Sequence, residues 1–464
     1  LLVEARASFF SHIEGRFRWM VDAKLTAARR EMLGAPSSAD VEASTIVNFI
    51  HETEKEVLTA AASTIADRTG TLFDLMLAEE PAPAPGKRNN NIPGPAAGPQ
   101  PLGMAPPRPE AIYFVMVDRF ANGDPSNDGA IDPADPAAFH GGDLQGLIDH
   151  LGELQALGIT TVWLSPVFKM RTEKFFEHGA FHGYWVEDFA QVEPRFGDRR
   201  LLQRLSRELH QRGMKLVLDV VLNHVAMDGA LLKQKPEWFH RKGPLTDWND
   251  EVQLTTHDVH GLPDLAVERE DVYRWLLDTS LMWVEELKPD GFRLDAVKHV
   301  PLSFWARYNE ALRAKAGRDF VLLGELLDGD PVKVAAMQRA GKFGQMFDFP
   351  LHFALIDVFC RDHPMPRLAT TLDADRLYDD PTSLVTLLDN HDLPRLMSAC
   401  GGELGRVQDA LAFMLALRGT PSFTWGTEVG LAGAHEPDNR ADMRFEPHPL
   451  KEHIRHGLEL RGRR

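Results

Sequence analysis

The chain has 464 residues, of which 44% are hydrophobic and 26% are charged, proportions typical of a globular protein with an ample core. Its formal net charge of −17 argues against nucleic acid as a partner, because no basic excess is available to neutralise phosphates. No apolar run reaches the roughly 18 residues that a membrane helix needs, so we expect no membrane partner. The two cysteines, Cys360 and Cys400, match neither a disulfide framework nor a metal motif, and we expect two thiols.

The first 110 residues divide into two segments of different composition. Residues 1–80 place apolar side chains such as Phe10, Ile13 and Phe17 at helical spacing, which predicts a small helical region of unknown role. Residues 81–110 are rich in Pro, Ala and Gly, the composition of an extended linker. Because the chain begins at Leu1 rather than Met, we expect a mature or truncated product, and the missing signal-peptide pattern carries no weight.

From residue 111 to residue 464, short apolar runs rich in β-branched residues alternate with amphipathic stretches. Eight such units predict an α/β fold, a (β/α)₈ TIM barrel. The stretch 226–266 follows the third predicted strand without clear periodicity, so we expect a short inserted domain there. The predicted strands span residues 111–118, 159–164, 215–221, 291–296, 321–325, 343–348, 384–389 and 421–425.

Several of these strands deliver polar residues at their carboxyl ends. Arg293 and Asp295 lie two residues apart on one strand, so both side chains leave the same face and the guanidinium keeps the carboxylate ionised. Glu325 ends the next predicted strand, and His391 and Asp392 follow a later one. Since the carboxyl ends of barrel strands meet at one face, these segments predict a single active site.

The same segments carry motifs of a known family. DVVLNH at 219–224, GFRLD at 291–295, GE at 324–325 and DNHD at 389–392 resemble, in order and spacing, the conserved regions of glycoside hydrolase family 13, the α-amylase family. HGYW at 182–185, LPDL at 262–265, GTP at 419–421, GTE at 426–428 and DNR at 438–440 extend the resemblance. It implies a catalytic barrel over residues 111–464, here without the β-sandwich that usually follows.

The resemblance implies three catalytic carboxylates. Asp295 would be the nucleophile, Glu325 the general acid and base, and Asp392 the group that stabilises the distorted sugar. Retaining glycosidic cleavage needs carboxyl groups in different protonation states. The implied activity is hydrolysis of internal α-1,4 bonds in starch-like glucans through a glycosyl-enzyme. Asp219 matches a supporting carboxylate that hydrogen-bonds to arginine.

Further residues match positions that hold the sugar in this family. Tyr184 resembles a stacking platform, since an aromatic face suits the C–H face of a pyranose. Arg293 is expected to orient Asp295, and Lys298 and His299 resemble the pair that binds the leaving side of α-1,4-glucans. The implied substrate-binding set is His182, Tyr184, His224, Arg293, Lys298, His299 and His391.

The implied cofactor is calcium, at one or two structural sites. Short oxygen side chains cluster around turn residues after residue 121, as a hard cation prefers, and the segment resembles the amino-terminal calcium loop of cyclodextrin glucanotransferases and some bacterial α-amylases. Asn122 stands where those loops often carry Asp. A second site, between barrel and insert, would use Asn223, Asp264 and the carbonyl of His299. The first site would use Asn122, Asp124, Asn127, Asp128, Gly141 and Asp143.

The type of family member stays open. LPDL at 262–265 resembles the α-amylase form, and His260 stands where cyclodextrin-forming enzymes carry an aromatic residue, which argues against cyclisation. Transfer to a sugar hydroxyl is one alternative, because it uses the same intermediate as hydrolysis. A catalytically inactive binding or accessory protein is the other. We expect a monomer acting on α-glucan, and secretion rather than cytoplasmic residence, since polymeric starch usually lies outside a bacterial cell.

Overall fold

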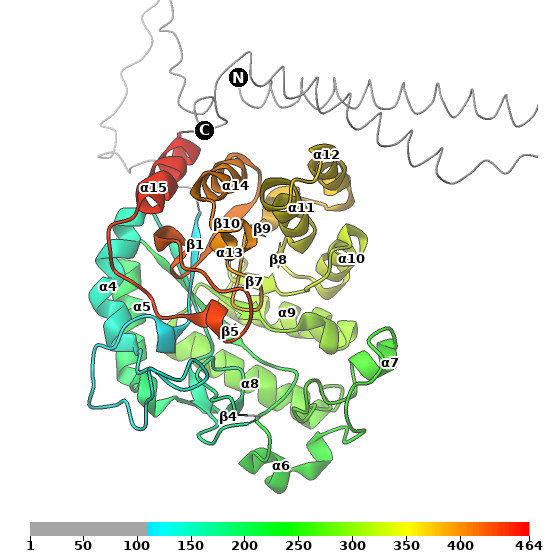
Figure 1. Ribbon diagram of the computed structural model, residues 1–464. Helices are drawn as coiled ribbons and strands as arrows, with labels where there is room; N and C mark the ends of the chain where they lie inside the picture. The colour runs from blue at the N-terminus through cyan, green and yellow to red at the C-terminus, as the bar shows by residue number, and fades with distance from the viewer. Residues whose placement is uncertain (1–109, 176, 464) are drawn as a thin grey trace, which may run out of the picture. The chain divides into compact units, whose positions relative to one another are not determined.

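The computed structural model describes residues 110–175 and 177–463. Within these residues, eight parallel strands close into a barrel in the order β1-β10-β9-β8-β7-β6-β5-β2, with helices around them (Figure 1). The predicted (β/α)₈ fold is confirmed, whereas the helices predicted in residues 1–80 and the linker up to residue 109 lie outside the described residues. The barrel strands are β1 (Ile112–Val115), β2 (Thr161–Leu164), β5 (Lys215–Val220), β6 (Gly291–Leu294), β7 (Val321–Gly324), β8 (Gln345–Phe347), β9 (Leu384–Leu387) and β10 (Thr420–Thr424).

Amphipathic helices cover the strands because one face of each is apolar. In α5, Leu202, Leu205 and Leu209 are fully buried at a spacing of three and four residues, and the helix packs on β5. None of the described helices combines the length and apolarity needed to cross a bilayer. The helices are α4 (Leu144–Leu157), α5 (Arg199–Gln211), α6 (Ala230–Gln234), α7 (Glu251–Leu254), α8 (Glu270–Leu287), α9 (Leu302–Ala316), α10 (Pro331–Gly341), α11 (Phe349–Cys360), α12 (Pro366–Asp373), α13 (Leu396–Ala399), α14 (Leu404–Ala416) and α15 (Pro449–Gly462).

The register of the central strands brings charged residues together. Asp219 on β5 pairs with Arg293 on β6, and Leu294 on β6 pairs with Gly324 on β7. The residues that follow β6 and β7, Asp295 and Glu325, therefore leave the barrel at the same level. Parallel pairing with this stagger places the predicted motifs at one face of the barrel.

Two segments interrupt the alternation of strand and helix. Between β2 and α5, the antiparallel strands β3 (Phe168–Met170) and β4 (Val186–Val192) form a pair that the sequence analysis does not predict, and residues 182–185 lie in its connection. Between β5 and α8, residues 226–266 contain the short helices α6 and α7 and isolated bridges such as Phe239 with Leu265. Both segments begin after the carboxyl end of a barrel strand, where substrate-binding elements of this fold are built.

Cys360 and Cys400 form a disulfide, so the expectation of two thiols is wrong. Cys360 ends α11 and Cys400 follows α13, and their Cα atoms lie 4.1 Å apart despite a sequence separation of 40. Helices α11 and α14 pack against each other and bring the two ends together. The sequence separation of the two cysteines does not predict this bond, because helix packing brings them together.

Candidate active site

Two neighbouring strand ends fix Asp295 and Glu325 at the carboxyl face of the barrel. The amide of Glu325 donates to the carbonyl of Leu294 at 3.0 Å, and the amide of Val297 donates to the carbonyl of Glu325 at 3.0 Å. The amide of Ala296 donates to Oε2 of Glu325 at 3.1 Å. The side chains of Asp295 and Glu325 are only 11% and 9% exposed. Strand pairing, rather than a loose loop, therefore sets the positions of both carboxylates.

Arg293 joins three carboxylates. Its Nη1 donates to Oδ1 of Asp295 at 2.6 Å and to Oδ1 of Asp219 at 2.9 Å. Its Nη2 lies 2.6 Å from Oε1 of Glu325, and the guanidinium is fully buried. The contact of Arg293 with Asp295 is predicted from the sequence, and the family resemblance predicts a hydrogen bond between Asp219 and an arginine. The contact with Glu325 depends on the pairing of β6 with β7 and is a finding of the structure.

The carboxylates of this cluster outnumber its cations. Burial raises the pKa of Asp219 to about 6, with Glu325 adding to the rise and Arg293 opposing it. Burial also raises the pKa of Asp295 well above its ordinary value, and the charges of Glu325 and Asp219 raise it further against Arg293, so in the free protein the guanidinium does not by itself keep this carboxylate ionised, contrary to the prediction from the sequence. One guanidinium does not neutralise three carboxylates, so the cluster as a whole retains a proton more readily than isolated acids do. A proton held beside an ionised carboxylate is the combination that acid-and-nucleophile chemistry needs.

Asp219 anchors the aromatic residue of the site. Its Oδ2 accepts a hydrogen bond from the hydroxyl of Tyr184 at 2.9 Å and one from Nε1 of Trp163 at 3.0 Å. The ring of Tyr184 is stacked with that of His391, with centroids 5.0 Å apart and an angle of 6° between the planes. Motifs in the sequence indicate Tyr184 and His391 but assign no role to Trp163, because a tryptophan inside an apolar strand is typical of the core.

Three buried histidines contact or flank Tyr184. The ring of His182 lies 5.8 Å from that of Tyr184, and Nε2 of His224 lies 3.1 Å from the carbonyl of Tyr184. Burial lowers the pKa of His224 to about 4 and lowers the pKa of His182 and that of His391 well below the ordinary value. All three imidazoles are therefore neutral at neutral pH. A neutral ring offers one donor and one acceptor, which suits hydrogen bonding to sugar hydroxyls.

Asp392 is held by an arginine from another loop. Nη2 of Arg440 lies 3.0 Å from Oδ1 of Asp392, and Nε of Arg440 donates to the carbonyl of His391 at 2.9 Å. Nε2 of His391 lies 3.3 Å from Oδ2 of Asp392. The Asp392 side chain is 35% exposed, more open than the other two carboxylates. Arg440 belongs to the DNR motif at 438–440, but the sequence alone indicates no role for it.

Lys298 and His299 follow the same strand as Asp295. Both lie in the short 3₁₀ turn η4 (Val297–His299). Nδ1 of His299 lies 3.0 Å from the carbonyl of Leu254 at the end of α7, so the turn contacts the inserted segment. The predicted leaving-side pair is thus next to Asp295 in sequence and next to the insert in space.

Asn223, Asp264 and the carbonyl of His299 converge on one point. The side-chain amide of Asn223 faces Oδ1 of Asp264 and the carbonyl oxygen of His299. An amide nitrogen in that position would donate to the same two oxygens at 3.1 Å and 2.8 Å. With the amide turned the other way, three oxygen atoms would meet there, the donor set that a hard cation prefers.

Asp143, a predicted calcium ligand, caps helix α4. Its Oδ1 accepts from the amide of Gly146 at 2.6 Å and from the amide of Gly123 at 3.1 Å. Its Oδ2 accepts from the amide of Asp124 at 2.8 Å. Backbone donors therefore already satisfy much of this carboxylate.

The neighbouring predicted ligands also bind one another. Nδ2 of Asn122 donates to Oδ1 of Asp128 at 2.8 Å, and a Cβ on Gly141 would lie 2.7 Å from that Nδ2. Oδ1 of Asn127 is buried without a hydrogen-bond partner among the described residues. Across residues 110–175 and 177–463, no three His, Cys, Asp or Glu side chains form a cluster that could hold a metal ion. Amide and carbonyl oxygens would therefore have to complete either predicted set.

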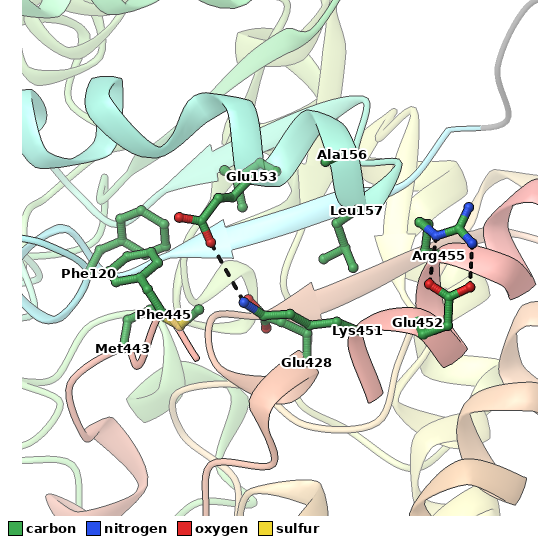
Figure 2. Close-up of a pocket in the computed structure, with 11 residues that line it drawn as sticks. Phe120, Glu153, Ala156, Leu157, Glu428, Met443, Phe445, Lys451, Glu452 and Arg455 are labelled. Carbon is green, nitrogen blue, oxygen red and sulfur yellow. Dashed lines mark hydrogen bonds and ion pairs between the residues drawn. The ribbon is translucent and has the colours of Figure 1, made fainter. Parts of the chain in front are cut away.

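A pocket outside the carboxylate cluster lies between α4 and α15 (Figure 2). Aromatic and aliphatic side chains line it, and Nζ of Lys451 lies 3.7 Å from Oε2 of Glu153 across it. Glu428, from the predicted GTE motif, borders this pocket and accepts a hydrogen bond from the hydroxyl of Tyr113 at 2.6 Å. The motif therefore ties the first barrel strand to the turn after the last one and adds nothing to the carboxylate cluster.

Residues 114–455 match the sequence profile described as "Alpha amylase, catalytic domain". The chain is 34% identical over 374 residues to "Beta/alpha-amylase" of Paenibacillus polymyxa, covering 74% of this chain and 30% of that protein. It is 32% identical over 380 residues to a cyclomaltodextrinase of Geobacillus thermopakistaniensis, covering 75% of this chain and 61% of that protein. The chain thus spans less than two thirds of the length of either relative. The structure of α-amylase from Geobacillus thermoleovorans, complexed with acarbose, is 37% identical with a TM-score of 0.71, covering 76% of this chain and 78% of that one.

Proposed function

The chain belongs to the α-amylase family, glycoside hydrolase family 13, and on that premise we propose that it hydrolyses internal α-1,4-glucosidic bonds of starch-like glucans with retention of configuration. The observation that carries the proposal is the buried guanidinium of Arg293, which contacts carboxylates from three neighbouring strands. This cluster can keep one carboxylate ionised while another holds a proton. Double displacement at a sugar needs those two protonation states.

In the proposed reaction, Asp295 attacks the anomeric carbon while Glu325 gives its proton to the glycosidic oxygen. The bond to the leaving chain breaks as an ester bond to Asp295 forms. Glu325 then takes a proton from water, the water oxygen attacks the anomeric carbon, and Asp295 leaves as a carboxylate. Arg293 stabilises the negative charge on Asp295 before the first step and after the second.

The remaining residues would hold the sugar in its reactive shape. Tyr184 presents a flat face on which the pyranose can stack, and its hydroxyl is already engaged by Asp219. The neutral rings of His182, His224 and His391 would hydrogen-bond to sugar hydroxyls. Asp392, fixed by arginine, would accept hydrogen bonds from the distorted sugar and stabilise positive charge in the transition state.

A structural calcium ion would fit Asn223, Asp264 and the carbonyl of His299. Each of the three residues can offer an oxygen atom at that point, the donor type that calcium prefers, when the Asn223 amide turns its oxygen toward Asp264 and His299. By binding oxygen atoms from the end of β5, the insert and the η4 turn, the ion would hold these three segments together. It would take no part in the reaction. The loop set around Asp143 stays a prediction, because its carboxylate is already hydrogen-bonded.

The disulfide supports secretion as the proposed location, because disulfides persist in oxidising surroundings. Transfer of the glucosyl group to a second glucan, rather than to water, is the alternative activity. It would proceed through the same ester on Asp295. The histidine at position 260 favours linear over cyclic products.

The proposal is tested by incubating the purified protein with soluble starch, pullulan and maltoheptaose in calcium buffer. Products are separated by chromatography and reducing ends are counted over time. Short linear maltooligosaccharides with rising reducing ends support hydrolysis, whereas longer or cyclic products without new reducing ends would assign a transferase. No change in any substrate would refute an enzymatic function. Asp295→Asn should lower kcat by about 10³-fold or more with an unchanged circular dichroism spectrum.

A further inference from the structure

The pocket between α4 and α15 has a volume of about 220 Å³ and lies outside the carboxylate cluster (Figure 2). Phe445, which lines it, keeps 36% of its surface exposed, so the pocket is reachable from solvent. Since an apolar cavity of about 150 Å³ can hold benzene, a ligand with one ring or a branched hydrocarbon body would fit. The apolar part of the wall is formed by Phe120, Leu154, Leu157, Met443 and Phe445.

Glu428 adds a buried carboxylate to this apolar lining. The residue is only 3% exposed. Its Oε1 accepts the hydrogen bond from the hydroxyl of Tyr113, whereas Oε2 is buried without a hydrogen-bond partner among the described residues. A carboxylate oxygen that has left water without gaining a donor is destabilised, so a ligand that donates a hydrogen bond to Oε2 would be stabilised there.

The two cations that line the pocket already have carboxylate partners. Nζ of Lys451 lies 3.7 Å from Oε2 of Glu153, and Nε of Arg455 donates to Oε2 of Glu452 at 2.9 Å. With Glu428, three carboxylates and two cations line the pocket, so one negative charge stays uncompensated. This balance favours a cationic ligand and repels an anionic one.

The aromatic wall of the pocket is held in place before any ligand binds. The ring of Phe445 is stacked on that of His150, with centroids 3.6 Å apart and an angle of 13° between the planes. The ring of Phe120 packs edge-on against Phe445 at 5.3 Å, and Nδ1 of His150 lies 2.8 Å from Oε1 of Glu153. A wall fixed in this way lowers the entropy lost when a ligand packs on it.

We propose that this pocket binds an organic ammonium ion whose body is a single ring or a branched hydrocarbon. The nitrogen donates a hydrogen bond to Oε2 of Glu428, and the body packs against Phe120 and Phe445. A sugar suits the pocket less well, because apolar walls would leave its hydroxyls without partners. The site is separate from the proposed hydrolysis, since none of the residues that line it belongs to the carboxylate cluster.

The test measures the affinity of the purified protein for phenethylamine by isothermal titration calorimetry at neutral pH. Phenethyl alcohol, which keeps the ring but carries no charge, should bind about 10-fold or more weakly. Glu428→Gln should weaken the binding of phenethylamine by a similar factor, because the new amide can still accept from Tyr113 but no longer carries a charge. Glu446→Gln is the matched control, since it removes the same charge from an exposed residue that does not line the pocket.

Two further variants keep the proposal open to refutation if Glu428→Gln does not fold. Phe445→Ala, at a partly exposed position, should weaken the binding of phenethylamine by about 3- to 10-fold. Asp295→Asn, which alters the carboxylate cluster, should bind it as the wild type does. Melting curves show whether each variant is folded.

Three results would overturn the proposal. The first is a wild type that does not bind phenethylamine at concentrations up to about 10 mM. The second is equal affinity for the amine and the alcohol, or equal affinity of the wild type and folded Glu428→Gln for the amine. The third is binding that Asp295→Asn abolishes, which would place the amine in the carboxylate cluster instead.

Discussion

Nη2 of Arg440 lies 3.0 Å from Oδ1 of Asp392, a carboxylate 48 residues earlier in the chain. The same nitrogen also donates to Oε1 of Glu436 at 2.6 Å, so two carboxylates share one donor. Since Nε of Arg440 binds the carbonyl of His391, this one side chain fixes both Asp392 and the backbone beside it. Arg440 is therefore a positioning residue for the group proposed to stabilise the transition state.

Arg440→Ala should lower kcat on maltoheptaose by about 10- to 100-fold and change KM less than about threefold. Displacing Asp392 should weaken its stabilisation of the transition state more than it weakens substrate binding. Arg440→Lys, which keeps a charge but loses the forked geometry, should recover part of kcat. Steady-state kinetics at several pH values measures both. Glu436→Gln is the control, since it keeps the size of the neighbour but not its charge. A kcat of Arg440→Ala equal to that of the wild type would contradict the positioning role.

Removing calcium should lower the melting temperature by about 5 °C or more if an ion joins Asn223, Asp264 and His299, because ligand binding to the folded state stabilises it. Differential scanning fluorimetry with EDTA, and with calcium added back, measures the change. Asp264→Asn should melt lower than the wild type and lose the response to calcium. The variant Asp124→Asn, in the predicted calcium loop around Asp143, shows which of the two predicted calcium sites is responsible. An unchanged melting curve after verified metal removal would exclude both.

Breaking the Cys360–Cys400 disulfide should lower the free energy of unfolding. With a sequence separation of 40, loop-closure entropy sets the loss at up to about 4 kcal/mol. Urea unfolding with and without dithiothreitol measures it, and the double variant Cys360→Ser with Cys400→Ser should be insensitive to the reductant. Two thiols that react with iodoacetamide in the unreduced native protein would show that the bond is absent.

Stability should fall as the pH falls from about 6.5 to about 4, in part because of His352. Burial lowers the pKa of this imidazole to about 4, while in the unfolded chain it titrates near its ordinary value of about 6.5. Between those values the unfolded chain binds more protons than the folded one, so acid favours unfolding. The loss per buried histidine is about 1.4 kcal/mol for each unit of pKa difference, as an upper bound.

The variant His352→Phe isolates this contribution. The ring of His352 lies 5.1 Å from that of Phe353 and 6.4 Å from that of Phe349, so an aromatic replacement has apolar neighbours. Urea unfolding at about pH 7 and about pH 4.5 should show a smaller loss of stability in the variant than in the wild type. Equal losses in both proteins would assign the pH dependence to other groups.

Local patterns in the sequence predict the eight strands and the residues at their ends. Apolar runs and their spacing are local properties, and the alternation of side chains along a strand already places Arg293 and Asp295 on one face. Tyr184, His391 and the three proposed catalytic carboxylates could likewise be named from motifs. Local patterns carry this information because strand formation and side-chain direction depend on neighbours within a few residues.

Which distant residues meet depends on the packing of the whole chain. The contacts of Arg293 with Glu325 and of Trp163 with Asp219 follow from the pairing of neighbouring strands. The Cys360–Cys400 bond follows from helix packing, and the place of Trp248 beside Lys298 follows from how the insert folds onto the η4 turn. Strand register, helix packing and loop conformation are set by the lowest free energy of the whole chain. They therefore cannot be predicted from any short segment alone.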